Sequence, residues 1–320
     1  MLDAASSLPP AVCSFGVANN SVTGTRRSAT NLTWSPPWRR NNAVSMRDRF
    51  DFATYWWIMT RLARTHRWVR FRDFARGEPA DPFVIVRHDV DYSPAAALRL
   101  AQQEAERGLF ATYFLLVGTR YYNLLAPEHA RVARRLVELG HEVGLHYDVN
   151  FLLSFPRAEW RGLLRAQARM LGDLAGAEVV SIAMHQPALN GEDPFRGDPE
   201  FINAYEQRFV RDAVYVSDSC RAWRNEGWSM LVTGVVPRRL QLALHPINWS
   251  EQDRNRESIF RSVHDELCEE VRRAGDELLA KIAVHSGVRE HEARAASAAE
   301  AHAPREAPHA PPRGAGDRDT

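Results

Sequence analysis

Short apolar runs alternate with longer amphipathic segments through the middle of the chain. The run FVIV at 83–86 predicts a fully buried strand. Further strands are predicted at 111–118, 141–148, 178–187, 213–219 and 240–246. Apolar residues at three- and four-residue steps predict helices at 93–108, 127–140, 156–176 and 257–284. Repeated strand–helix units indicate an α/β fold, with a mostly parallel sheet that is either open or closed into a barrel.

The two ends of the chain differ in composition from this middle part. Residues 1–45 are rich in Ser, Asn, Pro and Arg without periodicity, and residues 288–320 are mainly Ala, Pro, Arg and His. We expect both segments to be disordered, because such compositions cannot bury a core. No long linker interrupts the part between them, so we expect one domain over 46–287.

Composition and charge exclude several classes of protein. The 41 basic and 40 acidic residues give a formal net charge of +1, which offers no electrostatic argument for nucleic acid or an anionic membrane. Cys13, Cys220 and Cys268 lie far apart, which argues against a disulfide framework and a cysteine zinc site. No apolar run approaches the ~18–20 residues of a membrane span, and the N-terminus lacks the order of a signal peptide. We therefore expect a cytoplasmic protein.

Polar residues stand at the ends of most of the predicted strands. They are His88, Asp89 and Asp91 at the end of the first, His146, Tyr147 and Asp148 at the end of the third, and His185, Asp218 and His245 at the ends of the next three. Because the carboxyl ends of parallel strands lie on one face of a sheet or barrel, these side chains are expected to converge. Histidine and aspartate together suit a divalent metal, zinc first and other first-row metals next.

Each of these residues also has a structural interpretation. A single Asp after a strand is usually a helix cap or a turn former, and a single His is usually a satisfied polar residue. Arg87 could neutralise Asp89 and Asp91 in a salt-bridged turn. The repeated use of His at successive strand ends favours a site over a series of independent caps.

Five short segments, in order along residues 83–250, resemble the motifs of the polysaccharide deacetylase family, the NodB-homology or carbohydrate esterase 4-like group. They are RHDVD, GHEVGLHYD, HQP, SDSCRAW and LALHP. The chain departs from the family pattern at three positions. Val90 separates two acids that are usually adjacent, Asn150 stands where the family has a second His, and His185 replaces an Arg. The resemblance implies a distorted (β/α) barrel of about seven strands.

The resemblance also implies roles for the polar residues. Asp91, His146 and either His185 or Asp148 would hold the metal, for which Zn²⁺ is the first expectation on chemical grounds. Asp89 would be the base, although Asp89 and Asp91 could exchange roles.

His245 would be the acid, oriented by Asp218. Substrate contacts are expected from Arg87, Tyr147, Trp223 and Trp249, and the two tryptophans are equally good core residues.

Members of this family remove acetyl groups from N-acetylated sugars. We therefore expect a metal-dependent hydrolase of amide C–N bonds, whose partner is an acetylated sugar or polysaccharide precursor. Two alternatives stay open: a hydrolase of cyclic amides or ureides on the same fold, and a catalytically inactive sugar-binding domain. The sequence does not define the oligomeric state.

Overall fold

The structure is a computed structural model that describes residues 49–224, 227–233, 236–285, 291–292 and 294–297. The predicted disordered segment 1–45 lies outside the described residues. So does most of the segment 288–320, of which 291–292 and 294–297 are helical.

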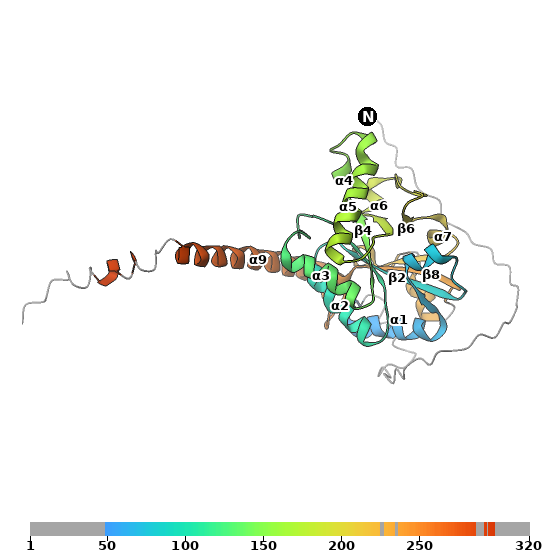
Figure 1. The fold of residues 1–320 in the computed structure, drawn as a ribbon. Helices are drawn as coiled ribbons and strands as arrows, with labels where there is room; N and C mark the ends of the chain where they lie inside the picture. The colour runs from blue at the N-terminus through green and yellow to red at the C-terminus, as the bar shows by residue number, and fades with distance from the viewer. Residues whose placement is uncertain (1–48, 225–226, 234–235, 286–290, 293, 298–320) are drawn as a thin grey trace, which may run out of the picture. The chain divides into compact units, whose positions relative to one another are not determined.

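One parallel sheet forms the centre of the domain (Figure 1). Its neighbouring strands follow the order β6-β5-β4-β3-β2-β8-β7, and β1 pairs with β2 outside this path. The seven strands of the path form a curled half-barrel with flanking helices, which confirms the predicted distorted (β/α) barrel. The strands are β1 (Arg67–Val69), β2 (Phe83–Val90), β3 (Thr112–Leu115), β4 (Glu142–Tyr147), β5 (Ser181–Met184), β6 (Ile202–Asn203), β7 (Val214–Ser217) and β8 (Arg239–Leu244).

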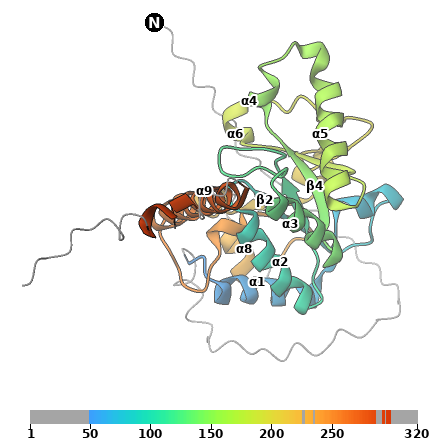
Figure 2. The ribbon, with the colours of Figure 1, turned by 60° about the vertical axis from the view of Figure 1, so that its left-hand side comes forward.

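Three long helices, α2, α3 and α5, follow one another along the outer side of the sheet (Figures 1 and 2). Ser93 caps α2 by accepting a hydrogen bond from the amide of Ala96, and Pro94 occupies its first turn, as predicted. The α-helices are α1 (Phe52–Thr65), α2 (Pro94–Glu106), α3 (Pro127–Glu138), α4 (Val149–Leu152), α5 (Trp160–Ala175), α6 (Pro187–Asn190), α7 (Gln207–Val210), α8 (Gly227–Thr233) and α9 (Arg256–His285). The 3₁₀ turns are η2 (Phe71–Arg76), η3 (Arg157–Glu159), η4 (Ser219–Arg221) and η5 (Pro246–Asn248).

β2 is longer than predicted, and this changes where its polar residues point. It continues to Val90, and all eight of its residues are buried. Because successive side chains of a strand point to opposite faces, Arg87 and Asp89 share one face while His88 points to the other. The prediction that His88 ends the strand at the site is therefore wrong.

His88 belongs instead to a buried polar group between β2 and the helices, the Glu104 cluster, made of Glu104, His88, Tyr55 and Tyr113. His88 Nε2 lies 2.9 Å from Glu104 Oε1, and the Tyr113 hydroxyl donates to Glu104 Oε2 at 2.7 Å. The Tyr55 hydroxyl also donates to Glu104. Burial alone would raise the pKa of Glu104, but the nearby His88 and the donated hydrogen bonds lower it to about 2.

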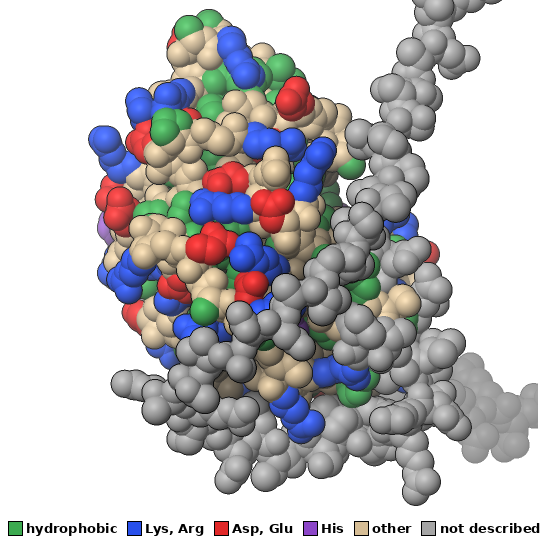
Figure 3. Space-filling model, turned by 90° about the vertical axis from the view of Figure 1, so that its right-hand side faces the viewer, with side chains coloured by type: hydrophobic (Ala, Val, Ile, Leu, Met, Phe, Trp, Pro, Cys, Tyr) green, Lys and Arg blue, Asp and Glu red, His purple; other side chains and the backbone are tan. Residues whose placement is uncertain are grey.

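On the face of the described residues drawn in Figure 3, basic and acidic side chains are interspersed, and neither sign of charge gathers into a patch. No helix among the described residues combines the length and the hydropathy that crossing a bilayer requires.

Candidate metal centre and active site

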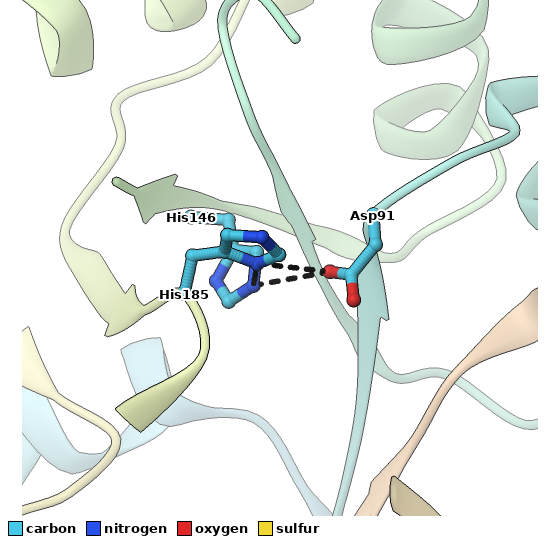
Figure 4. A group of neighbouring side chains, drawn as sticks. All are labelled: Asp91, His146 and His185. Carbon is cyan, nitrogen blue, oxygen red and sulfur yellow. Dashed lines mark hydrogen bonds and ion pairs between the residues drawn. The ribbon is translucent and has the colours of Figure 1, made fainter. Parts of the chain in front are cut away.

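Three side chains from three strand ends converge at one point (Figure 4). Asp91 follows β2 directly, His146 lies near the end of β4, and His185 follows β5. Asp91 Oδ1 lies 3.2 Å from His146 Nε2 and 3.4 Å from His185 Nδ1, and these two nitrogens are 3.1 Å apart. The sequence-based expectation of convergence therefore holds for these residues.

Backbone pairing between β4 and β5 orients both imidazoles. His146 Nδ1 lies 2.9 Å from the carbonyl oxygen of Ala183, the residue opposite it in the parallel ladder. Because this contact requires a proton on Nδ1, the neutral form of the ring presents the lone pair of Nε2 to Asp91. The backbone amide of His185 donates to the carbonyl of Tyr147 at 2.9 Å, which holds the loop after β5 beside β4.

The donor set fits a divalent metal ion. Ligands bound at ~2.0–2.1 Å in a tetrahedron are separated by ~3.3 Å, close to the three distances observed here. Asp91 Oδ1 is buried and, within the described residues, has no hydrogen-bond partner of good geometry. An oxygen acceptor and an imidazole nitrogen that face each other at this distance are satisfied by a shared proton or by a metal cation between them. Two nitrogens and one carboxylate suit zinc, cobalt, nickel or iron.

The environment keeps the Asp91 carboxylate charged. Burial alone would raise the pKa of Asp91, but the adjacent His146 and His185 and the charge of His245 lower it. For His185, burial would lower the pKa, and the Asp91 carboxylate outweighs burial and raises it, with a smaller contribution from Asp148.

Asp148, the other predicted candidate for the third ligand, lies outside the triangle. Its side chain caps α4, accepting a hydrogen bond from the Asn150 amide at 2.8 Å. Its charge influences His185 without its carboxylate joining Asp91 and His146. The geometry therefore favours His185 over Asp148. Asn150, at the position where the family has a His, bonds to Asp148 and Asn190.

A histidine–aspartate pair lies on the other side of Asp91. His245 Nδ1 is 2.6 Å from Asp218 Oδ1, and His245 Nε2 is 3.9 Å from Asp91 Oδ2. Asp218 is itself fixed, because its second oxygen accepts from Trp249 Nε1 at 3.0 Å. Burial alone would lower the pKa of His245, but the Asp218 carboxylate, with Asp91 and Asp89, raises it to about 10. The ring is thus cationic at neutral pH and carries a proton on each nitrogen.

Asp89 is paired with Arg87 in a buried ion pair. Arg87 Nε donates to Asp89 Oδ1 at 3.0 Å, and Arg87 Nη2 donates to Asp89 Oδ2 at 2.7 Å. Burial alone would raise the pKa of Asp89, but Arg87 and the nearby His146 lower it. The pairing with Arg87, considered in the sequence as a structural alternative, exists, and it involves Asp89 and not Asp91. The two acids consequently have different environments, with Asp91 beside the imidazoles.

Three of the four residues predicted to contact the substrate are buried in the structure. Arg87 and Tyr147 have no exposed surface, and Trp249 is 4% exposed. Arg87 contacts Asp89, Tyr147 donates to Asp193, and Trp249 donates to Asp218. Trp223 is half-buried and stacks on Phe50, with ring centroids 5.6 Å apart. In this structure the first three present no surface to a substrate, because the tertiary packing encloses them.

Sequence reasoning missed the residues that hold Arg87. Gln241 Oε1 accepts from Arg87 Nη1 at 3.2 Å, and the Tyr205 hydroxyl accepts from Nη2 at 2.7 Å. Gln241 carried a signal, since it is the one polar residue in the apolar run LQLAL. Tyr205 lies in a segment without a recognisable pattern, and nothing in the sequence pointed to it.

Comparison with family models finds no match, and neither does comparison with curated proteins. Comparison with solved structures finds carbohydrate esterases and deacetylases of the CE4 family. A CE4 family pseudoenzyme from Bacillus anthracis is 16% identical, with a TM-score of 0.37, over 60% of this chain and 63% of that one. This chain thus spans less than two thirds of that protein.

A peptidoglycan deacetylase from Bacillus subtilis is 16% identical, with a TM-score of 0.36, over 63% of this chain and 97% of that one. A family 4 acetyl xylan esterase from Clostridium thermocellum, solved with a cobalt ion, is 14% identical, with a TM-score of 0.36, over 60% and 84% of the two chains. These proteins belong to the group that the sequence motifs resemble. At such TM-scores we infer nothing about the chemistry of this chain from them.

Proposed function

We propose that this chain is a divergent polysaccharide deacetylase-like hydrolase that removes an acetyl group from an N-acetylated sugar with the help of a divalent metal, zinc by preference. The observation that carries the proposal is the position of Asp91. One of its oxygens faces His146 and His185, while the other faces the His245–Asp218 pair. A candidate cation site and a candidate proton donor would therefore lie on two sides of one carboxylate.

Amide hydrolysis requires an activated water, stabilisation of the developing oxyanion, and a proton for the leaving nitrogen. A divalent metal held by Asp91, His146 and His185 would supply the first two, because it lowers the pKa of bound water from 15.7 to ~7 and polarises a carbonyl. The protein must then supply the movement of protons, and Asp89 and His245 suit the two halves of that task.

Asp89 is the candidate base. Its carboxylate is ionised throughout the neutral range, because Arg87 holds its pKa below the ordinary value. His245 is the candidate acid. Its pKa of about 10 keeps the proton on Nε2 at neutral pH, and Asp218 compensates the ring's charge until that proton is given away. Groups of this kind typically contribute ~10²–10⁴-fold each to the rate.

For the substrate we keep the class that the sequence motifs suggest, an acetylated sugar or polysaccharide precursor. The catalytic unit would comprise residues 46–287. The same donor set would serve a hydrolase of cyclic amides or ureides equally well. An inactive sugar-binding domain, in contrast, has no need of three converging ligands.

The test is metal content, measured by mass spectrometry on full-length protein purified without a His tag and dialysed against added zinc. We expect about one ion per chain for the wild type and almost none for His146→Ala. His264→Ala is the matched control, since His264 is exposed on α9 and is not one of the three converging side chains. Acetate release is then assayed on acetylated sugars, beside a panel of cyclic amides. A wild type that retains no zinc, cobalt or nickel would overturn the proposal, and turnover of cyclic amides alone would replace the substrate class.

A further inference from the structure

Two of the eight tyrosines differ from the others in what their hydroxyl groups do. The hydroxyls of Tyr55, Tyr113, Tyr122, Tyr147 and Tyr205 all make hydrogen bonds inside the domain. The side chain of Tyr215 is engaged with its neighbours as well. Among the described residues, the hydroxyls of Tyr92 and Tyr121 alone have no such partner, so both are free to bond to a ligand.

Tyr92 and Tyr121 lie together beside the candidate metal centre. Tyr92 follows Asp91 in the chain, and its ring meets that of Tyr121 at a centroid distance of 4.8 Å and an interplanar angle of 74°. Phe260 of α9 supports Tyr92, with a centroid distance of 5.1 Å and an angle of 85°. Tyr121 is 39% exposed and Tyr92 is half-buried. We call these two rings the tyrosine ledge.

The loop that carries Tyr121 is held firmly. Residues 118–123 form a small hairpin, in which Gly118 pairs with Asn123 and the Thr119 amide donates to the Tyr122 carbonyl at 2.9 Å. The Tyr122 hydroxyl donates to the carbonyl of Val90 at 2.6 Å, one residue before Asp91. The hairpin is therefore fixed to the same strand end that presents Asp91, and Tyr121 is displayed at its tip.

We propose that the tyrosine ledge is the substrate-binding surface of the site and takes a pyranose ring of the N-acetylated sugar, which rests on the function proposed above. An aromatic ring offers a sugar an apolar face, and each free hydroxyl can bond to a sugar hydroxyl. A ring held in place by Phe260 and by the hairpin loses little conformational entropy on binding. Trp249, which the sequence suggested for this role, is instead packed inward against Asp218 and Phe50.

Binding is tested with chitotetraose, a soluble oligomer of N-acetylglucosamine, titrated calorimetrically into full-length protein. His146→Ala serves as the background, so that the sugar is not turned over during the titration. In that background we expect Tyr121→Ala to weaken binding ~2- to 12-fold, the range of a single aromatic contact. Tyr121→Phe keeps the ring and loses only the hydroxyl, so its affinity should lie between those of the background and Tyr121→Ala. Leu125→Ala, an exposed apolar residue nearby in the chain, is the control and should leave affinity unchanged.

Kinetics in the otherwise wild-type, zinc-loaded protein give the second measurement. Tyr121→Ala should raise KM for acetate release while kcat falls much less, because the ledge binds the sugar without touching the reacting bond. The proposal is overturned if Tyr121→Ala binds as tightly as its background, or if chitotetraose does not bind at all. If binding depends on Tyr121 but the wild type releases no acetate, the ledge is supported as a binding surface and the proposed hydrolase activity is refuted. Acetate release with the same KM in Tyr121→Ala as in wild type would support the hydrolase and refute the ledge.

Discussion

Glu104→Gln should destabilise the protein strongly although it removes no volume. Glu104 is 1% exposed and accepts hydrogen bonds from the hydroxyls of Tyr55 and Tyr113, with His88 Nε2 at 2.9 Å. A glutamine amide has the same shape, but it turns two donor hydrogens toward groups that already donate. At least one buried hydroxyl therefore loses its acceptor, and His88 loses a charged partner.

The magnitude follows from the pKa of Glu104. Its ordinary value of 4.5 falls to about 2 in the folded protein, a difference that corresponds to about 3 kcal/mol of stability. Leaving a buried hydrogen-bond donor without its acceptor typically costs about 1–3 kcal/mol, and more where one group is charged, which agrees in order of magnitude. We therefore expect a loss of about 3 kcal/mol in the free energy of unfolding at neutral pH.

The pH dependence has a definite sign. Because the folded protein lowers the pKa of Glu104, this contribution is complete above about pH 4.5 and is lost as the pH falls toward about 2. The difference between wild type and Glu104→Gln should therefore be largest at neutral pH and should shrink in acid. Urea unfolding followed by tryptophan fluorescence, at neutral pH and at about pH 3, measures both quantities.

Glu106→Gln, an exposed acid on the same helix, is the matched control and should change stability by no more than ~0.5 kcal/mol. The reasoning would be refuted if Glu104→Gln unfolded at the same urea concentration as this control. A difference that grew as the pH fell would equally contradict it.

Three further predictions concern the site and the strand beside it. Asp218→Asn removes the charge that outweighs burial at His245, so the pKa of about 10 should fall, and the loss of kcat in alkali should move to lower pH in a pH–rate profile. His185→Ala should lower bound zinc at least tenfold by mass spectrometry, whereas Asp148→Asn should retain it; the opposite result would make Asp148 the third ligand. Gly144→Ala should lower stability by about 1–3 kcal/mol in urea unfolding, because a Cβ there would lie 2.5 Å from a ring carbon of Phe114; unchanged stability would show that this ring can move aside.

The strand and helix order could be predicted because burial repeats with a regular period. Four of the six predicted strands enclose an observed one, β8 begins one residue before its predicted start, and β2 begins where the apolar run begins. β1 and β6 escaped prediction because strands of three and two residues are too short to show a period. The end of β2 was misplaced because its buried Arg87 and Asp89 neutralise each other within the strand, whereas the sequence suggested that pairing only for a turn after it.

The convergence of Asp91, His146 and His185 was predictable from topology, since all three lie at the carboxyl ends of parallel strands. The choice between His185 and Asp148 was not, because it depends on which way each side chain turns after its strand. The burial of Trp249 could not be foreseen either. It depends on Phe50 and Asp218, which are distant in the sequence and meet only in the folded chain.

The alternation of β2 also limits how this protein can have evolved. Arg87 and Asp89 face the site, while His88, between them, faces Glu104. Inserting or deleting one residue at the start of this stretch would exchange the two sets, placing an arginine and an aspartate against Glu104 and a histidine toward the site. Homologues should therefore vary freely in the loops after the strands but keep the length of β2, and an aligned gap within 83–91 would mark a protein that had lost both arrangements at once.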